Sequence, residues 1–304
     1  MKRPWLFIII LIVILAFLSF FIAGIASLFI ESDVEVTGSG NVALIPVKGE
    51  LVTDDDFSLF GADVTTSTDI IKLIEKADKN PTVKAFLFEI NSPGGSAVAS
   101  EEVASAIKKL KKPKVAWIRE AGASGAYWIA SSTDYIIASK MSVTGSVGVL
   151  ASYLDFSRFI QRYNISYERL VSGRFKDTGT PFRELTDEER KKFQQKLDLI
   201  HQEFLNQVIA NRKLSNAQAN KISTGEFFLG SEALDLALID EIGSKDEALR
   251  YVEKKLNITV SVVEYKKRKG FFESLSETMN EKFFYLGRGI GSSVQGDNRL
   301  AIRT

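Results

Sequence analysis

The stretch REAGASGAYWIA, residues 119–130, decides how the rest of the sequence is interpreted. A β-type run, KVAWI at residues 114–118, precedes it, and helix-forming residues follow from Tyr127. Ser124 is therefore predicted at a strand-to-helix turn, where a side chain is exposed and the free N–H groups of the helix face a developing anion. This pattern makes Ser124 a candidate nucleophile. The alternative is a serine that only caps the helix between two small residues.

Composition excludes several classes of function. The 304 residues, 45% of them hydrophobic and 25% charged, suit one catalytic-size globular domain with appendages. A net charge of +1 gives no electrostatic reason to expect nucleic acid as a partner. The absence of cysteine excludes disulfides, a thiol nucleophile and thiolate metal sites. The single histidine, His201, excludes a multi-histidine metal site, and its place in the predicted helix 186–213 suits a half-exposed packing residue. We therefore predict no metal and no cofactor.

The N-terminal region predicts a membrane anchor. Residues 5–30 carry no charge, and a helix of that length, at ~1.5 Å per residue, exceeds the ~30 Å hydrocarbon core of a bilayer. Lys2 and Arg3 precede the run and acidic residues follow from Glu31, which places the N-terminus in the cytoplasm and the later domain on the extracytoplasmic side. A cleaved signal peptide with its site at residues 24–26 is the alternative. The apolar run is longer than the usual ~7–15 residues of such peptides, so a retained single-pass anchor in the cell membrane is expected.

From residue 41 the pattern alternates between short strands and helices, which predicts parallel βα units and an α/β fold. The strands are expected at residues 42–47, 83–90, 114–118, 134–138, 142–150 and 166–171, and the main helices at 67–79, from 96 to about 111, 156–163 and 186–213. The domain organisation expected is an anchor at 1–30, a linker at 31–40, a catalytic domain at 41–265 and a tail at 266–304. The tail, partly an amphipathic helix, could dock on the domain, on a neighbouring subunit or on a membrane surface.

A glycine turn is expected near Ser124. Pro93-Gly94-Gly95 follows the strand that ends near residue 90, and the carboxyl ends of parallel strands meet at one edge of a sheet. Glycines let the backbone approach a substrate and direct N–H groups at it. We therefore predict an oxyanion hole from the amide of Gly94 or Gly95 together with that of Gly125. A plain turn is the alternative.

A serine nucleophile also needs a base, and a lysine can serve if burial disfavours its charge. Lowering a lysine pKa from ~10.4 to near 7 destabilises the ammonium by about 4–5 kcal/mol, which requires a dry pocket without a paired carboxylate. The segment VSGRFKD, residues 171–177, offers Lys176, provided that the side chain of Asp177 points elsewhere; a solvated surface cation is the alternative. Ser146, in TGS at 144–146, offers a hydroxyl to orient the amine, or marks a β-bulge.

The order and spacing of five short strings are similar to those of the signal peptide peptidase A (protease IV) family in its short membrane-anchored form. The strings are NSPGG (91–95), ASG (123–125), TGSVGV (144–149), SGRFKD (172–177) and LALIDEIG (236–243). The resemblance implies that Ser124 is the nucleophile, Lys176 the general base and Ser146 the residue that positions the lysine amine. It also implies that Gly94 and Gly95 form the oxyanion hole.

The resemblance further implies a fold of stacked ββα units like the Clp protease and crotonase proteins, and homo-oligomeric rings in which neighbouring subunits complete the active site. The expected function is a membrane-anchored serine endopeptidase that degrades remnant signal peptides and other apolar peptides. Alternatives are a related membrane serine protease that acts on stomatin-like partners, acyl-CoA chemistry of the crotonase type, and a non-catalytic membrane scaffold. The tail after residue 265 matches no pattern of the family.

Overall fold

The computed structural model describes residues 4–28, 34–54 and 64–268, so the tail predicted at 266–304 lies almost entirely outside the described residues. The chain divides into two units, which we describe separately. One comprises Val36–Lys266 and holds the α/β domain. The other comprises Met1–Glu35 and Lys267–Thr304.

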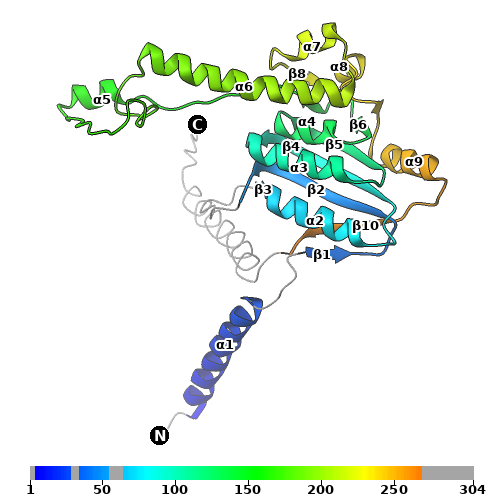
Figure 1. Ribbon diagram of the computed structural model, residues 1–304. Helices are drawn as coiled ribbons and strands as arrows, with labels where there is room; N and C mark the ends of the chain where they lie inside the picture. The colour runs from blue at the N-terminus through cyan, green and yellow to red at the C-terminus, as the bar shows by residue number, and fades with distance from the viewer. Residues whose placement is uncertain (1–3, 29–33, 55–63, 269–304) are drawn as a thin grey trace, which may run out of the picture. The chain divides into compact units, whose positions relative to one another are not determined.

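The α/β domain is organised on one ten-stranded sheet with the main order β1-β10-β2-β4-β5-β6-β9, in which most neighbouring strands pair in parallel (Figure 1). The strands are β1 (Val34–Thr37), β2 (Val42–Val52), β3 (Val64–Thr66), β4 (Ala85–Gly95), β5 (Lys114–Ala123), β6 (Tyr135–Ala138), β7 (Val143–Gly145), β8 (Phe227–Leu229), β9 (Glu241–Ile242) and β10 (Val262–Lys267). A short antiparallel pair, β7 with β8, joins the sheet through β7, which pairs in parallel with the last three residues of β5. The α/β class predicted from the sequence is confirmed.

The helices connect and cover these strands. They are α1 (Pro4–Leu28), α2 (Ser67–Lys79), α3 (Ala97–Lys109), α4 (Gly125–Ser131), α5 (Ser157–Arg162), α6 (Asp187–Arg212), α7 (Asn216–Ile222), α8 (Gly230–Asp235) and α9 (Lys245–Leu256). Helix α2 begins at the boundary predicted because the Thr66 side chain caps it by accepting from the Asp69 N–H at 3.0 Å. Its buried stripe, Ile70 through Ala77, faces the sheet.

The central strands are apolar on both faces, as a buried parallel sheet requires. On one face Leu44, Leu87 and Val115 pack with Val252 of α9 in a single core cluster. Helices α2, α3 and α4 contact the strands on the other side of the sheet, as Figure 1 shows. The sheet is thus a rigid base for the turns at the carboxyl ends of β4 and β5.

Several strands extend further than the sequence predicts. Strand β2 continues past its predicted end at residue 47 through Lys48-Gly49-Glu50, where the pairing register shifts and Gly49 has a φ of 73°. Strand β4 likewise includes Pro93–Gly95, expected as a turn, because Leu51 of β2 pairs with Gly95. Strand β1 occupies part of the predicted linker 31–40. Tertiary pairing overrides local turn chemistry at these places.

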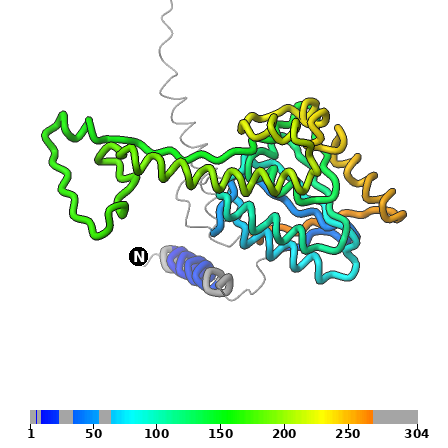
Figure 2. The backbone as a smooth tube through the Cα atoms, turned by 45° about the horizontal axis from the view of Figure 1, so that its top comes forward, coloured from blue at the N-terminus to red at the C-terminus, as the bar shows by residue number. Residues whose placement is uncertain are grey.

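A long projection, residues 150–199, extends from the domain; we call it the arm. It contains α5, the loop that follows and the N-terminal half of α6 (Figures 1 and 2). The strand predicted at 166–171 is absent from the described arm, whose residues 163–186 form turns and irregular chain. The other half of α6 is fixed to the body: Phe204 stacks on Trp128 with ring centroids 4.8 Å apart, and Arg212 forms an ion pair with Asp240 at 2.8 Å.

The other unit, Met1–Glu35 with Lys267–Thr304, includes α1, a 25-residue helix. The apolar side chains described in it, Trp5 and most of residues 9–22, are exposed. Within the described parts of the chain, no helix combines the length and apolarity of a membrane span. The structure therefore does not confirm the anchor predicted at residues 5–30.

Candidate active site

Ser124 lies at the junction of β5 and α4 with an unusual backbone conformation. Its φ of 52° and ψ of −126° correspond to the first central position of a type II′ turn, which glycine normally occupies. The Ser124 side chain makes no capping hydrogen bond, so the alternative that it only caps α4 does not hold. Its N–H donates to the Gly145 carbonyl at 2.8 Å, and its carbonyl accepts from the Tyr127 N–H at 2.9 Å. The backbone is thus held on both sides while the hydroxyl stays available, at a strain typical of functional sites.

Gly94 lies directly against this turn. A Cβ added at Gly94, where φ is +105°, would lie 2.9 Å from the Ser124 Cβ and 2.8 Å from the Gly125 nitrogen. Only glycine fits there, because a side chain would displace the nucleophile or the first turn of α4. The Gly94 N–H, however, donates to the Ser92 hydroxyl at 3.1 Å. Of the two amides that the sequence left open, the amide of Gly94 is therefore already engaged.

The amide of Gly95 has a different environment. The next residue, Ser96, donates its N–H to the Leu51 carbonyl at 2.8 Å, so the N–H of Gly95 points to the opposite side of the strand. A Cβ built on Gly125 would lie 3.6 Å from the Gly95 nitrogen, which places the two glycine backbones next to each other. This arrangement favours Gly95 and Gly125 as the two donors of an oxyanion hole.

Substitution of Gly94 by alanine is expected to destabilise the protein by roughly 2–4 kcal/mol and to lower peptide cleavage sharply, because the Cβ collides with the turn and the positive φ is strained. Thermal unfolding and an activity assay on the same sample measure both effects. Gly38→Ala is the matched control: its φ is +86°, but its nearest neighbour would be 3.6 Å away, so cleavage should be unchanged. A Gly94→Ala variant with wild-type cleavage would contradict this account of the turn.

Ser146 approaches Ser124 through the β7 strand. Gly145 pairs with Ala123 at the end of β5, and its carbonyl accepts from the Ser124 N–H. Ser146 follows with a φ of 51°, and its N–H donates to the Glu226 carbonyl at 2.9 Å. Its hydroxyl is therefore carried on fixed backbone beside the turn of Ser124.

One cavity joins these features. It has a volume of about 910 Å³, and five of the residues predicted from the sequence line it: Ser124, Gly94, Gly95, Gly125 and Ser146. Its other walls include the apolar side chains of Trp128, Leu197, Ile200 and Phe204. The cavity can therefore hold an extended apolar group beside the Ser124 hydroxyl.

Lys176 does not line this cavity. It is exposed and lies on the arm, in a run of turns where its N–H donates to the Gly173 carbonyl at 3.1 Å. In the described part of the chain the Lys176 ammonium has no ion pair, and the Asp177 carboxylate binds two arginines instead. One chain alone therefore brings together every predicted site residue except the base.

A relative named a protease in Methanocaldococcus jannaschii is 31% identical over 97% of this chain and 94% of its own length. Residues 106–259, which make up half of the chain, match the model of peptidase family S49. The chain belongs to peptidase family S49.

Further relatives of this S49 peptidase carry protease names. A relative named signal peptide peptidase SppA in Enterococcus faecium is 28% identical over 81% of this chain and 74% of that protein. The family resemblance expected from the sequence is thus confirmed. A solved structure of a membrane-bound stomatin-specific protease has a TM-score of 0.47 at 14% identity, and covers 81% of this chain and 100% of that one.

Among the cavity residues of the S49 peptidase that were not predicted as site residues, His201 and Glu50 are the titratable ones. His201 of α6 lines the cavity, and its Nε2 lies 3.1 Å from the Val147 carbonyl oxygen. That contact holds the chain just after Ser146 and leaves His201 in the packing role expected of it. Glu50 lies at the rim because β2 extends beyond its predicted end. Neither has a sequence signal, since each depends on the long-range pairing of its element.

Proposed function

We propose that this S49 peptidase is a serine endopeptidase that uses Ser124 as nucleophile and Lys176 as general base. The observation that carries the proposal is the strained conformation of Ser124, which has no capping role and faces a cavity beside two glycine amides. Strain of this kind costs stability and persists where the surrounding structure maintains it for function. Ser146 is proposed to orient the lysine amine.

In the proposed reaction the Ser124 Oγ attacks the scissile carbonyl carbon while the neutral Lys176 Nζ accepts the hydroxyl proton. The carbonyl oxygen becomes an oxyanion, which the N–H groups of Gly95 and Gly125 stabilise. The C–N bond then breaks, and the Lys176 ammonium gives its proton to the leaving amine. Water hydrolyses the acyl-enzyme through the same base and restores Ser124.

We propose that the base comes from the arm of a second copy. Lys176 is exposed in a single chain, where its charge would be fully solvated, whereas a base needs a dry site. The arm also exposes large apolar side chains, among them Leu150 at 84% and Leu170 at 96%, which suits a surface covered in an assembly. An adjacent subunit in a closed ring would receive the arm and bury Lys176 beside Ser124.

The proposed substrates are apolar peptides, including remnants of signal peptides. The cavity walls support this choice because Trp128, Leu197 and Phe204 offer apolar surface next to the nucleophile. Peptides left by membrane proteins are rich in such side chains. The proposal places the catalytic domain on the extracytoplasmic side of the cell membrane.

The proposed function is tested by labelling the full-length protein in detergent with a fluorophosphonate, which forms an ester with an activated serine. Labelling of the wild type and none of Ser124→Ala is expected. An unlabelled wild type, folded and assembled, would favour the non-catalytic scaffold.

Membrane anchoring through residues 5–30 is proposed from their lack of charge and from Lys2 and Arg3 in front of them. Deletion of residues 1–30 is expected to move the protein from the membrane fraction to the soluble fraction. An external protease should degrade the domain in spheroplasts but not in inverted vesicles. Retention of the deleted chain on membranes, or protection in spheroplasts, would contradict the proposed anchor or its orientation.

A further inference from the structure

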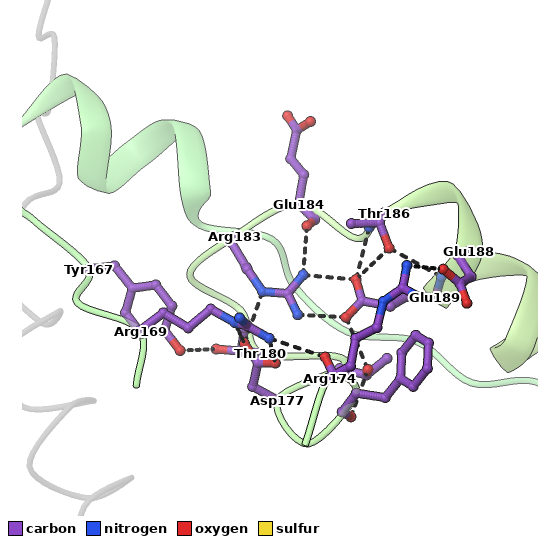
Figure 3. Close-up of polar contacts among 12 residues, drawn as sticks. Tyr167, Arg169, Arg174, Asp177, Thr180, Arg183, Glu184, Thr186, Glu188 and Glu189 are labelled. Carbon is purple, nitrogen blue, oxygen red and sulfur yellow. Dashed lines mark hydrogen bonds and ion pairs between the residues drawn. The ribbon is translucent and has the colours of Figure 1, made fainter. Parts of the chain in front are cut away.

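Asp177, the residue after Lys176, is the centre of an ionic network on the arm (Figure 3). Arg169 holds the Asp177 carboxylate with two hydrogen bonds, from Nε to Oδ2 at 2.6 Å and from Nη2 to Oδ1 at 2.7 Å. Arg183 adds a third, from Nε to Oδ2 at 3.0 Å. Both carboxylate oxygens of Asp177 are thus occupied by guanidinium groups, and no Asp177 ion pair with Lys176 is formed among the described residues, as a base would require.

The same network continues into the first turn of α6. Arg183 uses its other two nitrogens for Glu189, from Nη1 to Oε2 at 2.8 Å and from Nη2 to Oε1 at 2.6 Å. Glu189 is only 3% exposed and also accepts the Thr186 N–H at 2.9 Å, which completes a capping box. Thr178, two residues after Lys176, places its hydroxyl 3.0 Å from the same carboxylate. Arg174, two residues before Lys176, pairs with Glu188 of α6, so the loop of Lys176 is fixed to α6 on both sides of Asp177.

The network is balanced in charge. Two arginines, Arg169 and Arg183, face two carboxylates, Asp177 and Glu189. The other charges beside the loop are Arg174, which pairs with Glu188, and Lys192, whose ammonium lies 4.8 Å from the Phe175 ring centroid; they stay the same when a member of the network is replaced. Loss of one member would leave an excess charge next to Lys176, and its sign would depend on which member is lost.

The carboxylates of Asp177 and Glu189 stay ionised throughout the pH range in which a lysine titrates. Hydrogen bonds from Arg169 and Arg183 hold the pKa of Asp177 well below its usual value, and those from Arg183 and the Thr186 N–H do the same for the pKa of Glu189. Because both pKa values are lowered, the stabilisation is present above the usual carboxyl range near pH 4 and is lost only as pH falls toward the folded pKa. Between neutral and alkaline pH both carboxylates stay ionised, so their own titration does not contribute to a change in the pH profile there.

We propose that Asp177, Arg183 and Glu189 are positioning residues for Lys176: they fix its loop to α6, and they keep the Asp177 carboxylate from pairing with its ammonium. This proposal rests on the proposed function, since it assigns these residues to the base of that reaction. The rigid α6 then carries the loop as part of the arm toward a second copy.

The test is the pH dependence of kcat/KM for an apolar peptide, measured on the full-length assembly. Arg183→Gln leaves one negative charge in excess, which stabilises the ammonium, so the alkaline limb is expected to move to higher pH by about half to one unit. Asp177→Asn leaves one positive charge in excess and is expected to move the limb to lower pH by a similar amount. In both variants kcat on the plateau should fall about three- to tenfold with KM within about twofold, because the loop is less well placed.

Three further variants make the outcome decisive. Arg183→Lys restores the charge and is expected to return the limb to near its wild-type position. Arg158→Gln is the matched control: Arg158 lies on α5, is 89% exposed and pairs with the Glu184 carboxylate at 3.2 Å, whereas Arg183 contacts Glu184 through its backbone carbonyl. The four charges of the network therefore stay in place, and the profile should equal that of the wild type. If Arg183→Gln fails to assemble, the isosteric Asp177→Asn decides the test by the direction of its shift.

Limbs that do not move, or that move in the same direction in both variants, would overturn the positioning role, since a purely structural effect has no dependence on charge sign. Lys176→Ala is measured beside them. If it abolishes cleavage while the limbs of the other variants stay unchanged, only the positioning role fails. If Lys176→Ala cleaves like the wild type, the proposed base fails and the positioning role with it.

Discussion

Replacement of Ser124 by alanine is expected to lower kcat/KM for peptide cleavage by at least about 10⁴-fold, and replacement by glycine is expected to lower it equally while raising the thermal stability. The hydroxyl is the proposed nucleophile, so both variants lose the covalent step. They differ only in the backbone, because alanine keeps the strain at a φ of 52° and a ψ of −126°, whereas glycine relieves it. A gain of about 1 kcal/mol is therefore expected for Ser124→Gly over Ser124→Ala.

This pair of variants separates a functional serine from a structural one. The measurement combines steady-state cleavage with thermal unfolding of the assembled protein. Lys213→Gly is the matched control, since Lys213 also has a positive φ of 53° at the end of α6 but lies outside the cavity. It should gain stability and keep wild-type cleavage. A Ser124→Gly variant that cleaves peptides at the wild-type rate would contradict the assignment of Ser124 as the nucleophile.

The second large effect is expected at Lys176. Lys176→Ala should abolish cleavage while leaving folding and assembly intact, because its side chain makes no ion pair within the described chain. In the wild type, kcat/KM should rise with pH as the amine deprotonates, since only the neutral amine can accept the serine proton.

Lys191→Ala serves as the control for this variant, because Lys191 is an exposed lysine of the same arm. It should retain the wild-type rate and pH profile. Cleavage by Lys176→Ala at more than a few per cent of the wild-type rate would remove Lys176 as the base, and a pH profile flat from neutral to alkaline would do the same.

Local sequence signals predicted the fold well where the structure depends on neighbouring residues in the sequence. The limits of α2 follow from Thr66 as a cap and from its apolar stripe, and the structure has them where predicted. Strands β2 and β4 run past their predicted ends because each supplies the partner that extends the other, which no local pattern reveals. Residues 166–171, expected as a strand, form irregular chain in the arm, where the described structure has no neighbouring strand for their backbone to pair with.

The candidate site divides in the same way. Ser124 and the glycines were predictable because turns at the ends of neighbouring parallel strands meet at one edge of the sheet. Ser146 followed from its motif. Lys176 was also predicted by its motif. The sequence did not predict that Lys176 lies outside the cavity, because the length of helix α6 does not show where the first turn of that helix lies relative to Ser124. The caution over Asp177 is answered by two arginines, which spacing alone could not assign.

The most direct test of the account is to mix two inactive subunits. Ser124→Ala and Lys176→Ala chains with different affinity tags would be co-expressed, and assemblies that carry both tags would be purified and assayed. If the arm of one subunit supplies Lys176 to Ser124 of the next, random assembly at equal amounts should restore about a quarter of the wild-type sites. Doubly tagged assemblies with no more activity than either variant alone would contradict a site shared between subunits.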